Sequence, residues 1–345
     1  MRFFVIGDER FNIPGRLFRS DPYISYVLSG ALSVDRNSGP PAGSAISIHK
    51  GLAMKKALSE MTDRRALMRG GVPSKSGQVQ TWELVSQRLS ELPRGLTTYS
   101  TRLPHPIDTT GTAAHLKSDV AICSAVLELI EKNALFLFWY GRQGHRVEPG
   151  VYDGNYYDRV FSDSQLAVQV YVNRFFSPIL VAFVVAYAED GRVFMGSGAD
   201  TDLRESIDHA FQEVFLLGWC NVIQRNGPIT NTSWAPVSAA SLQHIRTLEE
   251  LPFCSGRSGL RGPLSERANP LDVLRAALPL WVSSLHVVYL PQEVRSTIRC
   301  ASAFSYELYN HRPLPRYLDA ERRINQETLR LTQRELLRFP VCPLS

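Results

Sequence analysis

The sequence contains two pairs of acidic residues whose members lie three positions apart. A cationic residue directly follows each pair. The two groups are Glu60, Asp63 and Arg64 in one segment, and Glu128, Glu131 and Lys132 in the other. Residues i and i+3 share one face of a helix, and Mg²⁺ binds carboxylate oxygens together with phosphate oxygens. The spacing therefore predicts that the four carboxylates hold a divalent ion with a nucleotide phosphate, which Arg64 and Lys132 would contact.

Each pair also has a plainer interpretation, because ExxE on a helix usually marks a solvated face, where the following cation adds only a few tenths of a kcal/mol. Glu131 argues against a solvated face, since it lies within the strongly apolar run AVLELIEKNALFLFW. A carboxylate buried in such a run needs a partner or an ion. The repetition of the pattern in two segments favours a shared site.

Two helices must carry the acid pairs. The first is expected near Lys55 to Met68, after a Gly/Pro/Ser-rich loop from Asn37 to Gly43. The second is expected from about Ser118, a plausible N-cap, to about Leu137. Between them, helical spacing of apolar residues resumes near Trp82 to Leu92.

The other expected elements mix strands and helices. Strands are expected at residues 3–6, Gln165–Val172 and Leu285–Tyr289, and Ile179–Ala188 and Val193–Gly196 form a hairpin around the turn residues 189–191. A helix begins near Asp202, where Glu205 completes a capping box, and runs through Glu213 and Trp219. Arg225 to Asn269 is expected to be mostly loop, and Tyr317 to Arg338 is expected to be an amphipathic, charged helix.

Composition places the chain among ordinary globular proteins. It has 345 residues, of which 44% are hydrophobic and 21% charged, and a net charge of +5 without any Lys/Arg block. We therefore expect no nucleic-acid partner. The five cysteines are isolated from one another, and the longest apolar run is shorter than the roughly 20 residues of a membrane helix. A cytoplasmic protein with no membrane contact is expected.

Three segments resemble the YcaO family, whose members bind ATP and magnesium through acid pairs on two helices and use ATP to activate peptide backbone amides. KALSEMTDRR resembles the first helix of the family, and TTGTAAHLKSDVAICSAVLELIEKNALFLFW resembles its SNGxAAG loop and ExxER helix. GSGADTDLRESIDHAFQE resembles the third block, where a glycine-rich turn opens a helix that bears a catalytic-site glutamate. The second segment is the specific one.

The resemblance implies a fold, a domain division and a set of site residues. The fold would be α+β, with mixed or antiparallel sheets packed against helices. Residues 1–42 would form an N-terminal strand and loop segment, and residues 43–345 a YcaO-like domain ending in a helix and the Pro-containing tail FPVCP. The implied residues are Glu213 as catalytic, Glu60, Arg64, Thr110, Glu128 and Lys132 for ATP, and Glu60, Asp63, Glu128 and Glu131 for Mg²⁺.

Several positions depart from the family pattern. The loop and the start of its helix carry Thr110, Ala113, Leu116 and Val120 where the pattern has Asn, Ser, Asn and Glu, and Leu216 stands in place of a Gln. Lys132 stands where the pattern has Arg. Its ammonium is a compact charge and cannot form the paired hydrogen bonds of a planar guanidinium. The ATP site is therefore either remodelled or degenerate.

The activity implied by the resemblance is cyclodehydration of Cys, Ser or Thr in a ribosomally made precursor peptide, as in peptide toxin or antibiotic maturation. Implied partners are the precursor peptide, an E1-like or other leader-binding protein for which the chain has no space of its own, and a flavin-dependent dehydrogenase. A homo-oligomer is also expected.

Two alternatives stay open. One is a scaffold of the same fold that has lost ATP use and docks the precursor peptide and partner enzymes. The other is an accessory protein for methylthiolation of a ribosomal protein.

Overall fold

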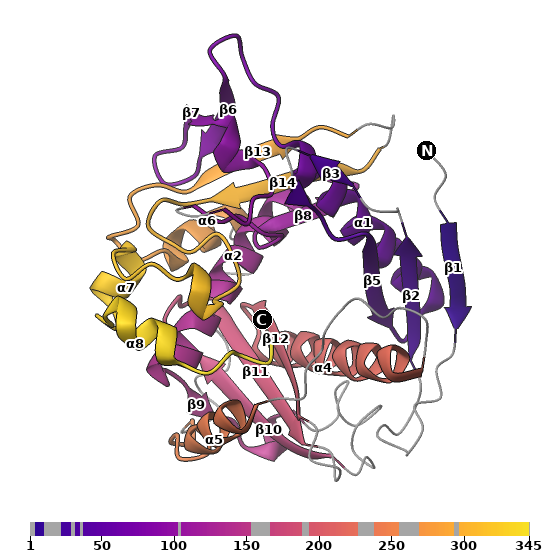
Figure 1. The fold of residues 1–345 in the computed structure, drawn as a ribbon, viewed down its shortest axis with the longest axis vertical. Coiled ribbons are helices and arrows are strands. Elements are labelled where there is room, and N and C mark those ends of the chain that lie inside the picture. Colours follow the sequence, from indigo (N-terminus) through magenta and orange to yellow (C-terminus); the bar gives the residue numbers. More distant parts are fainter. Residues whose placement is uncertain are drawn as a thin grey trace.

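The computed structural model describes residues 4–9, 22–28, 32–34, 37–102, 105–152, 166–187, 193–226, 238–254, 269–292 and 297–344. These residues form three antiparallel sheets and a small two-stranded ribbon, and the long helices α1, α2 and α4 pack against the sheets (Figure 1). The predicted α+β class with antiparallel sheets packed against helices is confirmed.

The first sheet has the order β1 (Phe4–Glu9), β2 (Tyr23–Leu28) and β5 (Ala42–Ser47), and α1 (Lys50–Arg69) packs on β2 and β5. The expected loop over 37–43 is wrong in part, because Asn37–Ser38 forms β4 against β3 (Ser33–Val34) and β5 begins at Ala42. Because β2 pairs with β5 across residue 42, the sheet includes both sides of the proposed domain boundary. That boundary stays a prediction.

The second sheet has the order β7-β6-β13-β14-β8. Its strands are β6 (Gln78–Glu83), β7 (Arg88–Pro93), β8 (Thr112–His115), β13 (His286–Leu290) and β14 (Arg299–Phe304). β13 confirms the strand expected at Leu285–Tyr289. The helix expected at Trp82–Leu92 is wrong: Trp82 and Leu89, which have helical spacing, are cross-strand partners in a hairpin, and burial along β6 alternates with period two.

The third sheet has the order β12 (Val193–Asp200), β11 (Leu180–Tyr187), β10 (Ala167–Asn173) and β9 (His145–Arg146). Its antiparallel β11–β12 pair confirms the predicted hairpin strands, while the turn residues 189–191 lie outside the described residues. α4 (Leu203–Asn226) packs along β12 and β11; it confirms the helix expected from near Asp202 and includes Glu213 and Trp219.

α2 (Ser118–Gly141) runs between the second and third sheets and contacts β8, β14 and β12 (Figure 1). Its C-terminal half is buried on all sides, and Phe138 stacks on Phe183 with ring centroids 4.4 Å apart. The N-cap is Lys117, without a side-chain cap, and not Ser118 as expected. Because both faces of the helix meet a sheet, Glu128 and Glu131 are half-buried, whereas Asp119 in the first turn is exposed.

The C-terminal region corrects two expectations. The single helix expected over 317–338 is divided into η4 (Pro315–Tyr317), α7 (Arg323–Glu327) and α8 (Gln333–Arg338). Arg330 adopts a left-handed φ of 55°, and a capping box between Thr332 and Glu335 then starts α8. The region expected to be loop before Asn269 contains α5 (Ala239–Leu248), capped by Ser238.

The remaining described elements are short helices. They are η1 (Arg94–Thr97), η2 (Pro149–Val151) and α6 (Pro270–Ala277). The Pro-containing tail is bound to α2 and α5, since the Trp139 indole donates to the Pro340 carbonyl at 2.8 Å and the Ser241 hydroxyl to that of Val341 at 2.9 Å. Among the described residues, no helix combines the length and the apolar character needed to cross a bilayer.

Candidate active site

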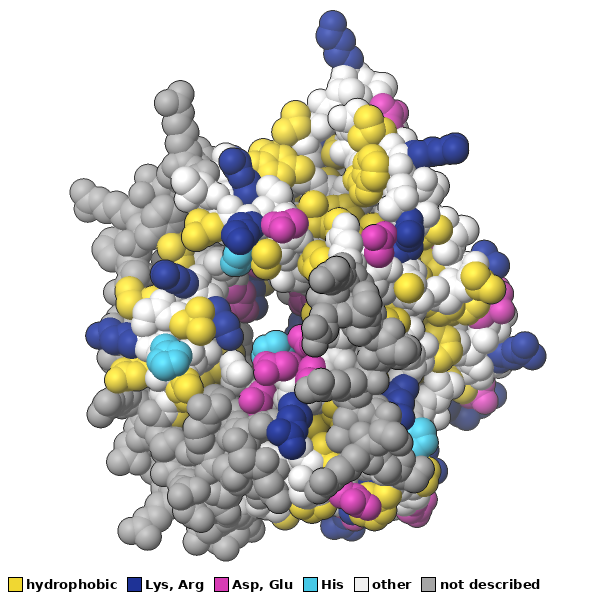
Figure 2. All heavy atoms as spheres, turned by 180° about the vertical axis from the view of Figure 1, so that it is seen from behind, with side chains coloured by type: hydrophobic (Ala, Val, Ile, Leu, Met, Phe, Trp, Pro, Cys, Tyr) yellow, Lys and Arg dark blue, Asp and Glu magenta, His cyan; other side chains and the backbone are white. Residues whose placement is uncertain are grey.

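A cavity of about 310 Å³ opens where β5, α1, α2, β12 and α4 meet. Its lining residues are Ala45, Ile46, Lys56, Glu128, Glu131, Lys132, Ser197, Gln212, Glu213 and Leu216. Figure 2 shows the molecule hollowed near its middle, with Asp and Glu side chains gathered on the wall of the hollow. Four of the residues singled out from the sequence, on two different helices, thus share one cavity.

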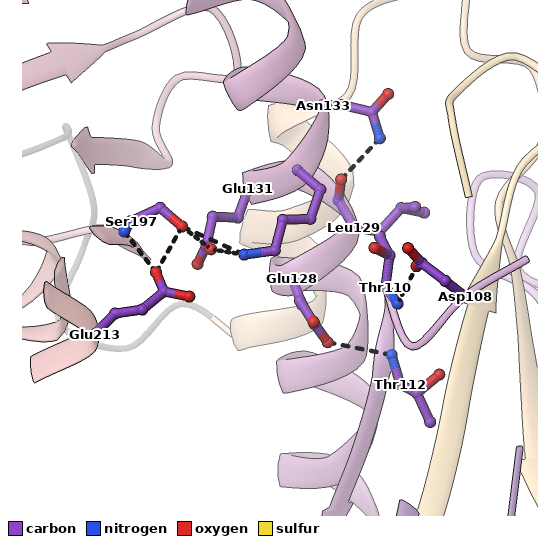
Figure 3. Close-up of polar contacts among 10 residues, drawn as sticks. Asp108, Thr110, Thr112, Glu128, Leu129, Glu131, Asn133, Ser197 and Glu213 are labelled. Atoms are coloured by element: carbon purple, nitrogen blue, oxygen red, sulfur yellow. Dashed lines mark hydrogen bonds and ion pairs between the residues drawn. The ribbon is translucent and has the colours of Figure 1, made fainter. Parts of the chain in front are cut away.

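Ser197 joins Glu131 of α2 to Glu213 of α4 (Figure 3). Its backbone N–H donates to Glu213 Oε2 at 2.6 Å, and its hydroxyl donates to Glu131 Oε1 at 2.5 Å while lying 3.1 Å from Glu213 Oε2. Lys132 Nζ donates to Glu131 Oε1 at 2.7 Å and to the Ser197 hydroxyl at 3.3 Å. Two carboxylates, one ammonium and one hydroxyl therefore form a single network.

The glycines that flank Ser197 allow this network to form. A Cβ on Gly196 would lie 2.1 Å from the Ala210 carbonyl oxygen, and one on Gly198 would lie 2.3 Å from that of Ser206. Both carbonyls belong to α4, so the missing side chains let the helix lie directly on β12. Glu213 reaches Ser197 because of this close approach.

Glu128 faces the loop that leads into β8. Its carboxylate accepts the Thr112 N–H at 3.3 Å, while Asp108 accepts the Thr110 N–H at 2.8 Å. Gly111, with a φ of 72°, makes the turn between the two threonines. The hydroxyls of Thr110 and Thr112 are buried and form no hydrogen bond within the described structure. Buried hydroxyls without partners are what a loop that contacts a polar ligand would present.

The acid pair on α1 lies beside the cavity. Glu60 accepts the Ser44 N–H at 2.5 Å and forms an ion pair with Arg64, which also donates to the Ala42 carbonyl. Asp63 is 8% exposed. None of these three α1 residues lines the cavity, and Arg64 is held by its own helix and by β5. Burial raises the pKa of Asp63, and the charges of Glu60 and, to a smaller extent, Glu128 add to the rise.

Burial has the largest effect on the pKa values of these acids. It raises the pKa of Glu128 to about 8, against the charge of Lys132, and the charges of Glu131 and Asp108 add to the rise. Burial also raises the pKa of Glu60 and Glu213, and that of Asp63 well above its usual range. Carboxylates in this state favour any added cation, because a cation replaces the protons they otherwise retain.

Burial alone would lower the pKa of Lys132, but the surrounding carboxylates raise it instead. Glu131, Glu213 and Glu128 all contribute to the rise. Lys132 is therefore a permanent cation in the cavity.

The donor set fits Mg²⁺ with a nucleotide better than it fits a closed metal site. Among the described residues, no group of three or more His, Cys, Asp or Glu side chains is close enough to hold a metal alone. Mg²⁺ commonly uses only one or two carboxylates and completes its octahedron with water and phosphate oxygens. The buried carboxylates and the unpartnered threonine hydroxyls fit such a shared arrangement.

Without metal, the stability that depends on Glu128 should decrease as pH rises. A folded-state pKa of about 8, above the unfolded value of 4.5, means that this contribution is complete below the unfolded pKa and is lost as pH rises through the folded one. We expect the unfolding temperature of the wild type to drop relative to Glu128→Gln across that interval. Thermal unfolding over a pH series checks this, with saturating MgCl₂ expected to reduce the drop. A difference between the two proteins that is independent of pH would contradict it.

The structure adds cavity residues that the sequence reasoning missed. Ser197 and Gln212 line the wall, and so does Lys56, whose ammonium donates to Gln212 Oε1 at 3.4 Å. Lys56 lies four residues before Glu60, on the same face of α1, and this spacing was the available signal. Of the departures from the family pattern, Leu216 lines the cavity, whereas Leu116 is 61% exposed.

Residues 75–244 match the family model described as YcaO cyclodehydratase, ATP- and Mg²⁺-binding. The match covers just under half of the chain and includes the loop, α2 and the whole of α4, but not α1. No curated protein matches the sequence.

Solved structures extend the likeness over the whole fold. YcaO from Methanopyrus kandleri bound with AMPPCP and Mg²⁺ is 15% identical, with 90% of this chain and 86% of that chain covered and a TM-score of 0.66. The E. coli microcin synthetase McbBCD complex is 13% identical, with 99% and 96% covered and a TM-score of 0.66. A heterocyclase in complex with substrate and cofactor is 15% identical, with 99% and 53% covered and a TM-score of 0.67. At these identities the matches show a shared fold.

Proposed function

We propose that this chain, which carries a YcaO-family cyclodehydratase domain, uses ATP and Mg²⁺ to activate backbone amides of a ribosomally made precursor peptide. The observation that carries the proposal is the cavity in which half-buried carboxylates of α2 and α4 meet Lys132, beside the acid pair of α1 and a loop with two unpartnered hydroxyls. Acids held in this way need a cation, and a nucleotide phosphate would bring one.

The proposed roles follow the contacts of each side chain. Asp63 and Glu128 form no ion pair within the described residues, so we propose them as the principal Mg²⁺ ligands. Glu60 and Glu131 are further candidate ligands, but each is paired with the cation beside it. Thr110, Arg64 and Lys132 are proposed to contact ATP, and Glu213 to act on the peptide.

In the proposed reaction, a Cys, Ser or Thr side chain of the peptide adds to the preceding amide carbonyl. The amide oxygen would take the γ-phosphoryl group with loss of ADP. Phosphate would then leave with that oxygen while the amide nitrogen gives up its proton to solvent, which yields a thiazoline or oxazoline. Bound Mg-ATP would supply the phosphoryl group and the positive charge near it. Catalysis then depends mainly on positioning and electrostatic stabilisation.

We propose that Glu213 takes the proton of the attacking side chain. Its carboxylate is fixed at one oxygen by the N–H and hydroxyl of Ser197. Burial raises its pKa, which brings the group nearer to neutral pH, where a general base is most effective.

A scaffold without ATP use is the second candidate. It is favoured by Leu216, an apolar side chain on the cavity wall, and by the pairing of Glu131 with Lys132. In that case the fold would dock the peptide and its partner enzymes.

Partner proteins are part of the proposal. The E. coli microcin synthetase is a complex, McbBCD, and one of its structures has pro-MccB17 bound. For this chain we propose a leader-binding partner of the E1-like type and a flavin-dependent dehydrogenase, and we propose that it forms a homo-oligomer.

An isotope experiment separates the two candidates. The short Cys/Ser/Thr-rich peptide encoded nearest the gene would be made with ¹⁸O in its amide carbonyls and incubated with the protein, its partner, ATP and Mg²⁺. Amide activation predicts one labelled phosphate for each water that the peptide loses, both counted by mass spectrometry. A peptide that remains unchanged, with no labelled phosphate formed, would leave the scaffold as the better account.

A further inference from the structure

The Lys132 ammonium lies near acceptor groups from three elements. α2 supplies Glu131 and Glu128, β12 supplies Ser197, and α4 supplies Glu213. We propose that the Lys132 ammonium takes the place of a divalent ion between Glu131 and Glu213. Metal binding in this chain is then left to Asp63 and Glu128. The inference rests on the proposed function, because it concerns the same metal site.

The geometry of the ammonium suits this role. One N–H donates to Glu131 Oε1 at 2.7 Å and another to the Ser197 hydroxyl at 3.3 Å. The Ser197 hydroxyl extends the network to Glu213, because it lies 2.5 Å from Glu131 Oε1 and 3.1 Å from Glu213 Oε2. A lysine ammonium donates in three directions and accepts in none, so it satisfies carboxylate and hydroxyl oxygens much as a bound cation does.

The distribution of charge leads to the same conclusion. Arg64 neutralises Glu60 through their ion pair, and Lys132 faces both Glu131 and Glu213. Asp63 and Glu128 remain, each without an ion pair among the described residues, and the charge of Glu128 acts on Asp63. Two carboxylates outside any ion pair match the one or two that Mg²⁺ commonly uses.

The position of Lys132 is also fixed. The side chain is 10% exposed, and its helix is buried between two sheets. Ser197 is held by the flanking glycines, which let α4 lie against β12. A metal that entered between Glu131 and Glu213 would have to displace an ammonium that the fold already holds in place.

Counting bound Mn²⁺ tests the inference directly. The free-ion EPR signal would be measured while MnCl₂ is added to the wild type, to Lys132→Met and to Lys75→Met, which removes the same charge from an exposed turn. We expect Lys132→Met to bind one Mn²⁺ more per chain than the wild type, and Lys75→Met to match the wild type. In thermal unfolding at about 100 times the dissociation constant, Mn²⁺ should raise the unfolding temperature of Lys132→Met by about 5 °C more than that of the wild type.

A second variant covers the case in which Lys132→Met fails to fold. The double variant Lys132→Met/Glu131→Gln removes the lysine together with its paired charge. It should fold without metal and bind no extra Mn²⁺. A double variant that folds no better than Lys132→Met in the absence of metal would overturn the counter-ion role.

The outcomes distinguish the inference from the proposed function. Equal and measurable Mn²⁺ binding by the wild type and Lys132→Met would overturn the inference and leave the metal site intact. Binding by Lys132→Met alone would support the inference and count against a working metal site in the wild type. Binding by neither protein would overturn both.

Discussion

Glu128→Gln is expected to lose Mg-ATP binding and peptide modification while unfolding at a higher temperature than the wild type. The two effects have opposite signs and one cause. Burial raises the pKa of Glu128 to about 8, so the protein must either retain a proton on this carboxyl or bind a cation beside it. A neutral amide removes the unfavourable free energy of ionising a buried carboxyl, and it also removes the carboxylate that would bind the cation. At neutral pH the gain in unfolding free energy without metal should be on the order of 1 to 3 kcal/mol.

Glu91→Gln is the matched control, since it makes the same chemical change on an exposed residue of β7. Activity and stability should both stay within error of the wild type, as measured by peptide mass spectrometry and thermal unfolding. A Glu128→Gln protein that modifies peptide at the normal rate would remove Glu128 from the proposed site. One that is less stable than the wild type would contradict the electrostatic account.

Gly196→Ala is expected to be both destabilising and inactive. A Cβ at this position would lie 2.1 Å from the Ala210 carbonyl oxygen, and a backbone oxygen cannot move aside as a flexible side chain can. α4 must shift away from β12, at a cost of about 1 to 3 kcal/mol for overpacking of a tight contact. The shift would separate Glu213 from Ser197, and a displacement of about 1 Å can reduce the rate roughly 100-fold.

Gly51→Ala provides the control for Gly196→Ala, because a Cβ at Gly51 meets nothing within 4 Å. Gly51 lies in the first turn of α1, so this change should leave activity unaltered and raise stability by up to about 1 kcal/mol. Urea unfolding and peptide turnover would be compared for the two variants. A Gly196→Ala protein that behaves like Gly51→Ala would show that the approach of α4 to β12 does not position the site.

Local sequence patterns predicted those helices and strands in which the buried residues recur at one regular spacing. The second acid-pair helix and the β11–β12 hairpin were expected close to where the structure places them. The hairpin of β6 and β7 was missed because Trp82 and Leu89 have helical spacing along the chain and yet pair across two strands. The break after Glu327 depends on a left-handed Arg330, which a charged amphipathic pattern does not reveal.

Part of the candidate site could also be predicted from local sequence patterns. The i and i+3 spacing identified the acids on α1 and α2, and the resemblance added Glu213. The role of Ser197 could not be foreseen, because it arises from the packing of β12 between α2 and α4. Arg64 was expected to face phosphate, but its hydrogen bonds to Glu60 and the Ala42 carbonyl depend on how β5 packs against α1.

The most direct test of the central claim is a calorimetric titration of the wild-type protein with ATP in the presence and absence of MgCl₂. If the cavity between α1, α2 and α4 is a working nucleotide site, ATP should bind with a dissociation constant in the micromolar range, and binding should require the metal. No binding in the presence of MgCl₂, even with a candidate partner protein added, would contradict the account and favour the scaffold.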